Sequence, residues 1–298
     1  MVRFKAKEIH MTVLTPFKID SKLQIGLTTL KVKNLSNMTD FYQTQIGLSL
    51  LDQDTQSALL GIAADNRPIL RLLSNPDGQS YPRAIGLFHL AILLPTRADL
   101  GQWLRHYLQT HQLDGAGDHI VSEALYLNDP EGNGLEIYWD RPRETWTVNG
   151  ESIRMDTLRV DIPGVLAEAH SAPFEQMPSG TTTGHIHLQV DSVEKAAGFY
   201  RQILGFSQTA YMSTQAGFFG AGGYHHHIGS NIWNSRGATP PPADALGLDR
   251  YELIFSSQAL LQEVLARLKE NDIPFEKSTA GFETTDPAGN KLVLKPEI

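Results

Sequence analysis

The chain has 298 residues and no cysteine, and this absence excludes several kinds of chemistry. Disulfides, thiolate nucleophiles, iron–sulfur clusters and zinc sites built on thiolates all need that residue. Any bound metal must therefore be held by His, Asp, Glu or Tyr side chains. The sequence also lacks an apolar run long enough to span a bilayer or to form a signal peptide. We therefore expect a cytoplasmic protein with no membrane partner.

Positive charge is scarce as well. The 25 Lys and Arg residues are outnumbered by 33 Asp and Glu, and the net charge is −8. Nucleic acids attract proteins through clusters of Lys and Arg, so no nucleic acid is expected as a partner. A small, neutral or weakly charged ligand fits this charge balance better. The composition leaves open whether the chain forms a homo-oligomer.

An internal repeat gives the sequence its organisation. The stretches "LKVKNLSNMTDFYQTQIGLSL" and "LQVDSVEKAAGFYRQILGFSQ" align at a constant offset. Their shared positions are Leu30, Val32, Phe41, Tyr42 and Gly47 in the first and Leu188, Val190, Phe199, Tyr200 and Gly205 in the second. These stretches are two copies of one unit.

Two further copies are related in the same way. "HLAILLPTRADLGQWLRHYL" resembles "YELIFSSQALLQEVLARLKE", and each is followed by an Asp-Pro turn and a strand, in "NDPEGNGLEIYW" and "TDPAGNKLVLKP". In every copy, an alternating apolar run predicts a strand, a 3.6-residue period predicts a helix, and Gly, Asn and Pro separate several short strands. We therefore predict an α+β fold of four βαβββ modules, which begin near residues 25, 86, 184 and 248.

We expect these modules to form two barrel-like domains. An irregular stretch, "IPGVLAEAHSAPFEQMPSGTTTG", is rich in Pro, Ser, Gly and Thr and reads as a linker between the second and third modules. A second irregular loop, "SRGATPPPADALG", precedes the fourth. The predicted ranges are 1–160 for the N-terminal domain, with modules at about 25–80 and 86–145, and 180–298 for the C-terminal domain, with modules at about 184–235 and 248–298.

Four phrases in order carry a resemblance to a known superfamily. They are "GLFHLAILLPTRADL", "SEALYLNDPEGNGLEIYWDRPRETW", "TTTGHIHLQVDSVEKAAGFY" and "GGYHHHIGSNIW". With the four modules, they resemble the vicinal-oxygen-chelate superfamily of glyoxalases, bleomycin-resistance proteins and extradiol dioxygenases. From about residue 25 to the end, the chain is most similar to the bacterial catechol 2,3-dioxygenase type. The resemblance implies glyoxalase-type domains and an oxidoreductase that cleaves a small aromatic diol with O2.

The resemblance also implies where a metal is bound. In this superfamily the ligands come from the first strand of a module and from the last strand, after the Asp-Pro-x-Gly-Asn turn. The first-strand positions, in chain order, are Leu27, His89, His185 and Arg250, and the last-strand positions of modules two and four are Glu136 and Val293. Only modules two and three keep ligands, so we expect those two to share the active barrel. Modules one and four would then cover the outside or pair with each other.

His89, His185 and Glu136 form the expected triad. Two imidazoles and one carboxylate on one side of an ion suit non-haem Fe(II), with Mn, Zn or Ni as alternatives. A histidine at the start of a strand is more often an ordinary hydrogen-bonded residue. Two observations weigh against that interpretation. The two histidines occupy matching positions in different modules, and the Glu lies where a half-buried strand would favour an apolar residue. His187, on the same side as His185 by alternation, could compete as a ligand or contact the ligands from outside.

Three adjacent histidines, His225, His226 and His227, lie where module three should have its last strand. The resemblance implies a histidine there that performs acid–base work, and the motif matches His226. Because strand side chains alternate, either His226 faces the cavity alone or His225 and His227 face it together. In the second case His227 would lie opposite Glu136 and could be a fourth metal ligand, as in a glyoxalase, while His225 could be a ligand or contact the ligands from outside. A polar strand edge with exposed imidazoles is the structural alternative.

The remaining candidates are assigned from the resemblance and from context. Tyr126, ten residues before Glu136, matches a tyrosine whose hydroxyl reaches the substrate oxygen, although a strand tyrosine is also a common packing residue. His119 lies near a further family histidine, but its spacing to Tyr126 is shorter than expected. The histidines without a supporting context are expected to be solvated: His10, His106, His111 and His170.

Two other functions compete with the dioxygenase. A glyoxalase I-type isomerase or lyase would use Zn or Ni with four protein ligands and no oxygen. A metal-free protein that sequesters small molecules, of the drug-resistance kind, would leave the agreement of His89, Glu136 and His185 without a cause.

Overall fold

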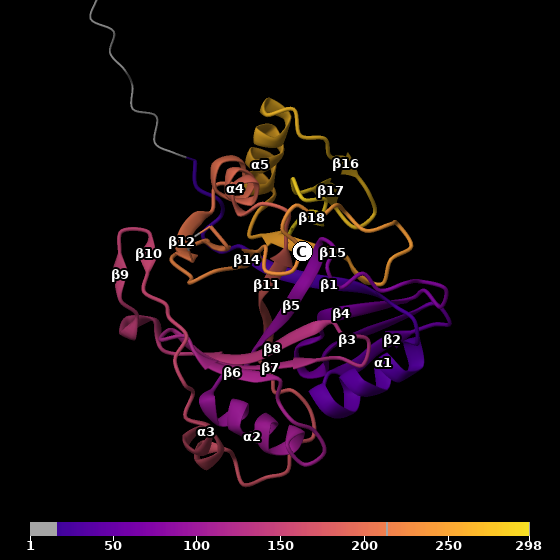
Figure 1. The fold of residues 1–298 in the computed structure, drawn as a ribbon, viewed down its shortest axis with the longest axis vertical. Helices are drawn as coiled ribbons and strands as arrows, with labels where there is room; N and C mark the ends of the chain where they lie inside the picture. Colours follow the sequence, from indigo (N-terminus) through magenta and orange to yellow (C-terminus); the bar gives the residue numbers. More distant parts are fainter. Residues whose placement is uncertain (1–16, 213, 298) are drawn as a thin grey trace, which may run out of the picture.

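Two eight-stranded sheets make up most of the computed structural model, which describes residues 17–212 and 214–297 (Figure 1). The first sheet has the order β16 (Glu276–Lys277), β17 (Phe282–Thr285), β18 (Lys291–Pro296), β15 (Gly247–Phe255), β1 (Gln24–Val32), β4 (Arg67–Ser74), β3 (Ser57–Ile62) and β2 (Ser49–Gln53). The second has the order β12 (Ser207–Met212), β13 (Ala216–Gly220), β14 (Ile228–Asn231), β11 (Thr182–Gln189), β5 (Gly86–Leu93), β8 (Gly134–Asp140), β7 (Ser122–Asn128) and β6 (Gly115–Asp118).

The strand order confirms the prediction of four βαβββ modules and their arrangement. Within each module the first strand pairs in parallel with the last, as in β1 with β4 and β5 with β8. Between modules, β5 pairs antiparallel with β11, and β1 pairs antiparallel with β15. Modules two and three therefore share one sheet, whereas modules one and four share the other. A short hairpin, β9 (Val148–Asn149) and β10 (Ser152–Ile153), forms a separate two-stranded sheet, and β10 lies near β12.

Each module contributes one main helix that begins after a capping side chain. These helices are α1 (Leu35–Phe41), α2 (Arg97–Tyr107), α4 (Val193–Ala197) and α5 (Gln258–Glu270). The side chains of Asn34, Thr96, Ser192 and Ser257 accept a hydrogen bond from the first turn of the respective helix. Two of these helices widen into a π-helical turn, η1 (Tyr42–Ile46) after α1 and η4 (Gly198–Ile203) after α4. Short 3₁₀ turns complete the set at η2 (Ala63–Asp65) and η3 (Arg143–Thr145).

The apolar cores follow the two halves of the chain rather than the two sheets. One core joins residues of modules one and two, and the other joins mainly residues of modules three and four. Each sheet, in contrast, contains strands from both halves. The halves are thus interlocked through hydrogen bonds along β5 with β11 and β1 with β15. The division into domains 1–160 and 180–298 stays a prediction.

The expected linker is not wholly irregular. It contains α3 (Ile162–Glu168), which begins after the capping side chain of Asp161 and packs beside α2 below β6 to β8 (Figure 1). Val165 of α3 is fully buried in the core of the first half, and this burial explains why the segment folds despite its composition. A prediction made from Pro, Gly and Ser content alone missed this packing.

The repeated Phe-Tyr and Asp-Pro signatures meet in space. Tyr42 donates a hydrogen bond of 2.8 Å to Asp129, and Tyr200 donates one of 2.9 Å to Asp286. Each contact links the helix of one module to the Asp-Pro turn of the next. Burial raises the pKa of both carboxyl groups, although hydrogen bonds oppose the shift. The repeat therefore encodes a buried hydrogen bond that fastens neighbouring modules.

Removing one of these hydroxyls is expected to destabilise the fold. Tyr42→Phe leaves Asp129 buried with fewer donors, and a hydrogen bond to a charged group contributes roughly 1.5–3 kcal/mol. We expect a loss of about that size in the free energy of unfolding, measured by urea denaturation. Tyr81→Phe, at a tyrosine that is 43% exposed, is the control. Equal stability of the two variants would contradict this role for the contact.

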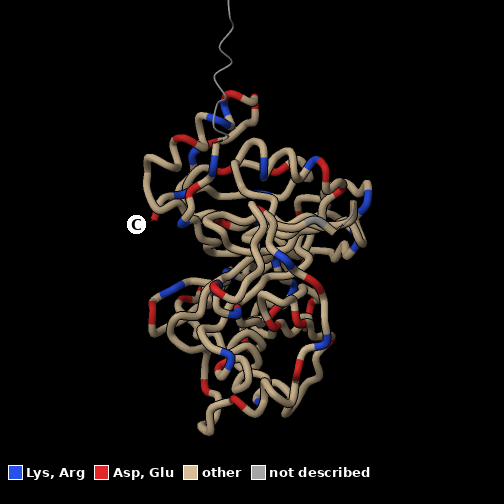
Figure 2. Tube along the Cα trace, turned by 90° about the vertical axis from the view of Figure 1, so that its left-hand side faces the viewer, with Lys and Arg blue, Asp and Glu red and all other residues tan. Residues whose placement is uncertain are grey.

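Acidic and basic residues are spread over the whole fold. In Figure 2 the red and blue segments are mixed along the trace, and neither sign is confined to one region. Among the described residues, no helix is both long enough and apolar enough to cross a membrane.

Candidate metal centre

Three neighbouring strands bring His89, Glu136 and His185 together. Glu136 on β8 is paired with Ala91 on β5, and Ala91 is paired with His185 on β11. Directly paired residues present their side chains on the same face of a sheet. His89, two residues before Ala91, shares that face. Because Ala91 carries only a methyl group, the longer side chains on either side of it can approach each other.

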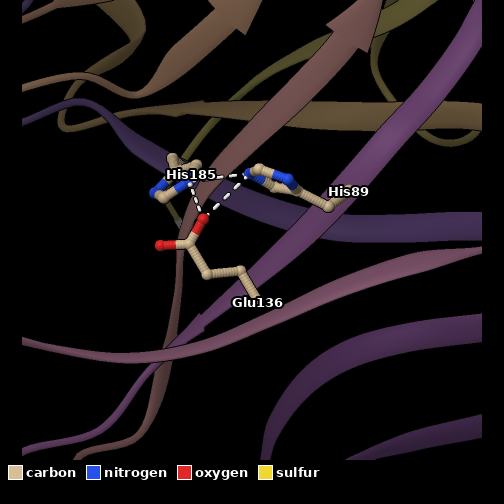
Figure 3. Close-up of side chains that lie close together, drawn as sticks. All are labelled: His89, Glu136 and His185. Carbon is tan, nitrogen blue, oxygen red and sulfur yellow. Dashed lines mark hydrogen bonds and ion pairs between the residues drawn. The ribbon is translucent and has the colours of Figure 1, made fainter. Parts of the chain in front are cut away.

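The three side chains converge at one point (Figure 3). His89 Nε2 lies 3.0 Å and His185 Nε2 lies 3.3 Å from the same oxygen, Oε2 of Glu136. The two imidazole nitrogens are 3.3 Å apart. All three residues are buried, and their ligand atoms lie within 4.8 Å of one another. Such an arrangement places three donor atoms around a space that suits a single cation.

The electrostatics of the cluster also fit a cation. Burial opposes the charge on Glu136, but His185 and His89 hold the pKa of this carboxyl well below its usual range. Burial lowers the pKa of His185, against the opposing influence of Glu136. The cluster thus combines a carboxylate with a neutral imidazole whose lone pair is available. Two imidazoles and one carboxylate are the donor set of non-haem Fe(II) sites, and these residues fit that group.

A cavity of about 610 Å³ opens beside the triad. Ligand sites of this kind are concave and mostly apolar, with a few polar groups. Besides the triad, aromatic side chains and further histidines line it, among them Phe88, His119, Tyr126, His187, Phe218, His225, His226 and Trp233. Trp233 is 44% exposed despite its large apolar ring, which makes it a ready contact surface for an apolar ligand. The cavity is larger than an unsubstituted catechol ring requires.

The strand predicted across the three adjacent histidines is wrong. Strand β14 begins only at Ile228, and the histidines lie in the turn that precedes it. Gly222 and Gly223 adopt positive φ angles of 57° and 72°, and they end the regular alternation on which the expected parity depended. As a result, His225 and His226 both line the cavity. Strand alternation predicts either His226 alone or His225 together with His227.

His226 packs against the metal-site residue His185. Their ring centroids are 4.2 Å apart, and the ring centroid of Phe218 lies 5.0 Å from that of His226. Burial and the neighbouring imidazole of His185 lower the pKa of His226 well below its ordinary value. The imidazole is therefore neutral and can act as a proton acceptor.

His227 does not line the cavity. Its Nδ1 accepts a hydrogen bond of 3.2 Å from the backbone nitrogen of Ala221. Burial lowers the pKa of His227 to about 3. The expectation that His227 could complete a four-ligand site with Glu136 finds no support in this position.

Tyr126 and His119 form a pair at the cavity wall. Tyr126 lies directly opposite Glu136 in the pairing of β7 with β8. Its hydroxyl lies 2.6 Å from His119 Nε2, and His119 Nδ1 lies 3.0 Å from the carbonyl of Asp156. Because a carbonyl only accepts, His119 donates from Nδ1, and its Nε2 accepts from the tyrosine. Burial and the Glu136 carboxylate raise the pKa of Tyr126 well above its ordinary value, so the phenol keeps its proton.

The other histidines occupy different surroundings. His187 is paired with His89 across the sheet and lines the cavity, and its Nε2 has no hydrogen-bond partner among the described residues. Burial lowers the pKa of His187 well below its ordinary value. His106 is half-buried and donates to the carbonyl of Thr44, which corrects the expectation that it is simply solvated. The remaining three are His111 and His170, which are exposed, and His10, which lies outside the described residues.

Three polar residues behind the site were not predicted from the sequence. Tyr138 contacts His185, Tyr224 contacts Tyr138, and Asp140 contacts both Tyr224 and His225. A signal for two of them was present in "EIYWD", because alternation from Glu136 places Tyr138 and Asp140 on the same face. Tyr224, in contrast, belongs to an irregular turn.

Most of the chain matches one family. Residues 24–137 and 182–294 match the profile described as "Glyoxalase/Bleomycin resistance protein/Dioxygenase superfamily". The chain belongs to this superfamily. The two matched segments cover modules one with two and modules three with four, so the family match and the strand order describe the same repeat.

Two superfamily relatives are dioxygenases. The chain is 40% identical over 280 residues to "Catechol-2,3-dioxygenase" of Bacillus subtilis (strain 168), covering 92% of this chain and 98% of that protein. It is 29% identical over 155 residues to "Biphenyl-2,3-diol 1,2-dioxygenase 3" of Rhodococcus globerulus, covering 48% of this chain and 80% of that protein. These relationships make the chain a dioxygenase-type oxidoreductase of the superfamily.

Solved structures show the same fold at lower identity. A Bacillus subtilis protein has a TM-score of 0.64 at 14% identity, covering 94% of this chain and 86% of that one. Glyoxalase I from Zea mays has a TM-score of 0.55 at 15% identity, covering 92% of each chain. These structures share the arrangement of modules with this chain.

Proposed function

We propose that the chain is an extradiol ring-cleaving dioxygenase that acts on catechol-like aromatics with O2 and an Fe(II) ion. The convergence of two imidazoles and one carboxylate beside a large, mostly apolar cavity carries this proposal. His89, His185 and Glu136 would hold the ion. Bound Fe(II) would supply positive charge that favours ionisation of the diol and a place where the diol and dioxygen meet.

The surrounding side chains have distinct roles in this proposal. His226 accepts a proton from a diol hydroxyl and returns it during ring opening, as a general acid and base. Tyr126, held by His119, directs its hydroxyl toward the substrate oxygen. Phe88, Phe218 and Trp233 pack against the apolar part of the substrate. Both oxygen atoms enter the product, a hydroxymuconic semialdehyde when catechol is the substrate.

The competing functions receive less support. The glyoxalase I-type alternative requires a fourth protein ligand, and the surroundings of His227 offer none to the triad. A metal-free binding protein would leave the Glu136 carboxylate buried at 3% exposure without the cation that its convergence with His89 and His185 suits, and burying a carboxylate is costly. A cytoplasmic location stays a prediction.

The proposed function is tested with protein purified without oxygen. We expect about one iron per chain by elemental analysis, and oxygen uptake with formation of a yellow product when catechol is added. Because the cavity exceeds the size of one ring, 3-phenylcatechol is expected to be cleaved as well. Consumption of a methylglyoxal–thiol adduct without oxygen uptake would favour the glyoxalase instead, and a chain that cleaves neither diol would contradict the proposal.

A further inference from the structure

Asp140, at the end of β8, connects two parts of the site. Its Oδ1 lies 2.8 Å from His225 Nε2, and its Oδ2 accepts a hydrogen bond of 2.8 Å from the hydroxyl of Tyr224. An ionised carboxylate can only accept hydrogen bonds. Both neighbours must therefore direct a proton toward Asp140, and the direction of every hydrogen bond beyond them follows from this requirement.

The first chain of hydrogen bonds leads to the proposed acid–base residue. His225 donates a hydrogen bond from its Nε2 proton to Asp140, so the Nδ1 of a neutral His225 carries no proton and can only accept. That Nδ1 lies 2.8 Å from Nδ1 of His226, which must then be the donor. The proton on Nδ1 leaves Nε2 of His226 as the unprotonated nitrogen. Because His226 lines the cavity, this is the nitrogen available to a substrate hydroxyl.

The second chain leads to a metal-site residue. Tyr224 donates its single hydroxyl proton in the hydrogen bond to Asp140. It must therefore accept a hydrogen bond from Tyr138, whose hydroxyl oxygen is 2.7 Å away. Since Tyr138 uses its own hydroxyl proton in the bond to Tyr224, it accepts a hydrogen bond from Nδ1 of His185 at 3.3 Å. The proton of His185 is thereby held on Nδ1, and its Nε2, the nitrogen that faces Glu136, keeps its lone pair for a cation. Burial raises the pKa of both tyrosines well above the ordinary value, so neither loses its proton.

We propose that Asp140 is a positioning residue that sets the direction of both hydrogen-bond chains, one ending at His226 and the other at His185. The functional roles of those two histidines rest on the proposed function. When His226 accepts a proton at Nε2, its Nδ1 proton passes to Nδ1 of His225, and the positive charge then lies beside Asp140. The same transfers in reverse return the proton to the substrate.

Gly184 leaves the space that the Tyr138 hydroxyl occupies beside His185. The pairing of β11 with β5 is irregular between Thr183 and His185, and a Cβ atom at Gly184 would collide with the hydroxyl of Tyr138. A bulge at this position re-aims the following side chain. Only glycine therefore allows Tyr138 to lie beside His185.

Asp140→Asn is a sharp test because an amide has one acceptor oxygen and one donor nitrogen. If its nitrogen faces Tyr224, the tyrosine chain reverses and His185 loses the acceptor of its Nδ1 proton. If its nitrogen faces His225, the histidine chain reverses and His226 carries its proton on Nε2. We expect a loss of about 10–100-fold in Zn²⁺ affinity, in kcat for catechol, or in both, as is typical when a residue that orients a ligand is replaced.

Two measurements accompany this variant. Zn²⁺ affinity is measured by competition with a chelator, which needs no turnover. In the Zn²⁺-loaded wild type, ¹⁵N NMR of the imidazoles is expected to show protons on Nε2 of His225 and Nδ1 of His185. Asp118→Asn is the matched control. It neutralises a nearby carboxylate that pairs with Arg141 and belongs to neither of the two hydrogen-bond chains. We expect this control to match the wild type.

Several results would overturn the proposal. A wild type with a bare Nε2 on His225 or a bare Nδ1 on His185 would do so even if Asp140→Asn fails to fold. Unchanged Zn²⁺ affinity together with unchanged kcat in Asp140→Asn would do so as well. If the wild type cleaves no diol, the proposed function is wrong, whereas the Zn²⁺ and NMR results still decide whether Asp140 sets these directions.

Discussion

Replacing His89 or Glu136 by alanine is expected to remove bound iron and to abolish ring cleavage. Each of these residues supplies one of the three donor atoms that lie within 4.8 Å of one another, and the described residues offer no further member of that group. The loss of metal affinity should therefore exceed the roughly 10–100-fold that follows when only an orienting neighbour of a ligand is changed. Iron content by elemental analysis and oxygen uptake with catechol are the two measurements.

The control for this experiment is His111→Ala, at an exposed histidine. Glu136→Gln adds a more stringent comparison, because it keeps the size of the side chain and removes its charge. We expect it to lose iron as well, since the carboxylate is the only anionic donor of the triad. Stoichiometric iron in His89→Ala would contradict the assignment of His89 as a ligand.

His226→Ala is expected to have the second-largest effect and the opposite pattern. Iron should be retained, because His226 is not among the three converging donors. The value of kcat should fall by about 10²–10⁴-fold, the usual contribution of a general acid or base. Steady-state kinetics with catechol, together with iron analysis of the same preparation, separates this outcome from loss of metal.

His227→Asn provides a matched control from the adjacent position. An asparagine oxygen can accept the hydrogen bond from Ala221 that Nδ1 of His227 accepts now. Since His227 does not line the cavity, turnover should remain close to that of the wild type. If His227→Asn lost turnover and His226→Ala kept it, the acid–base role would belong to His227 and our assignment to His226 would be wrong.

The modules could be predicted from the repeat, and the triad could be proposed from the family resemblance, because these features lie in regular elements. His89, His185 and Glu136 occupy strands whose alternation and repeat are visible in the residues themselves. The turn at residues 222–227 could not be predicted in the same way, since two glycines with positive φ end the alternation there. The contacts between Tyr138 and Tyr224 depend on residues 86 positions apart, and no local pattern encodes such a pairing.

The interlocking of the two halves has a consequence for when the protein can become active. His89 and Glu136 belong to one half, whereas His185 and His226 belong to the other, and the seam between β5 and β11 is what joins them. A nascent chain in which only the first half has folded therefore holds just two of the three donors, and it lacks His226, the proposed acid–base residue. Under the proposed function, ring cleavage therefore waits until module three has been made and β11 has paired with β5, and an ion that bridges the seam would in turn hold the finished halves together.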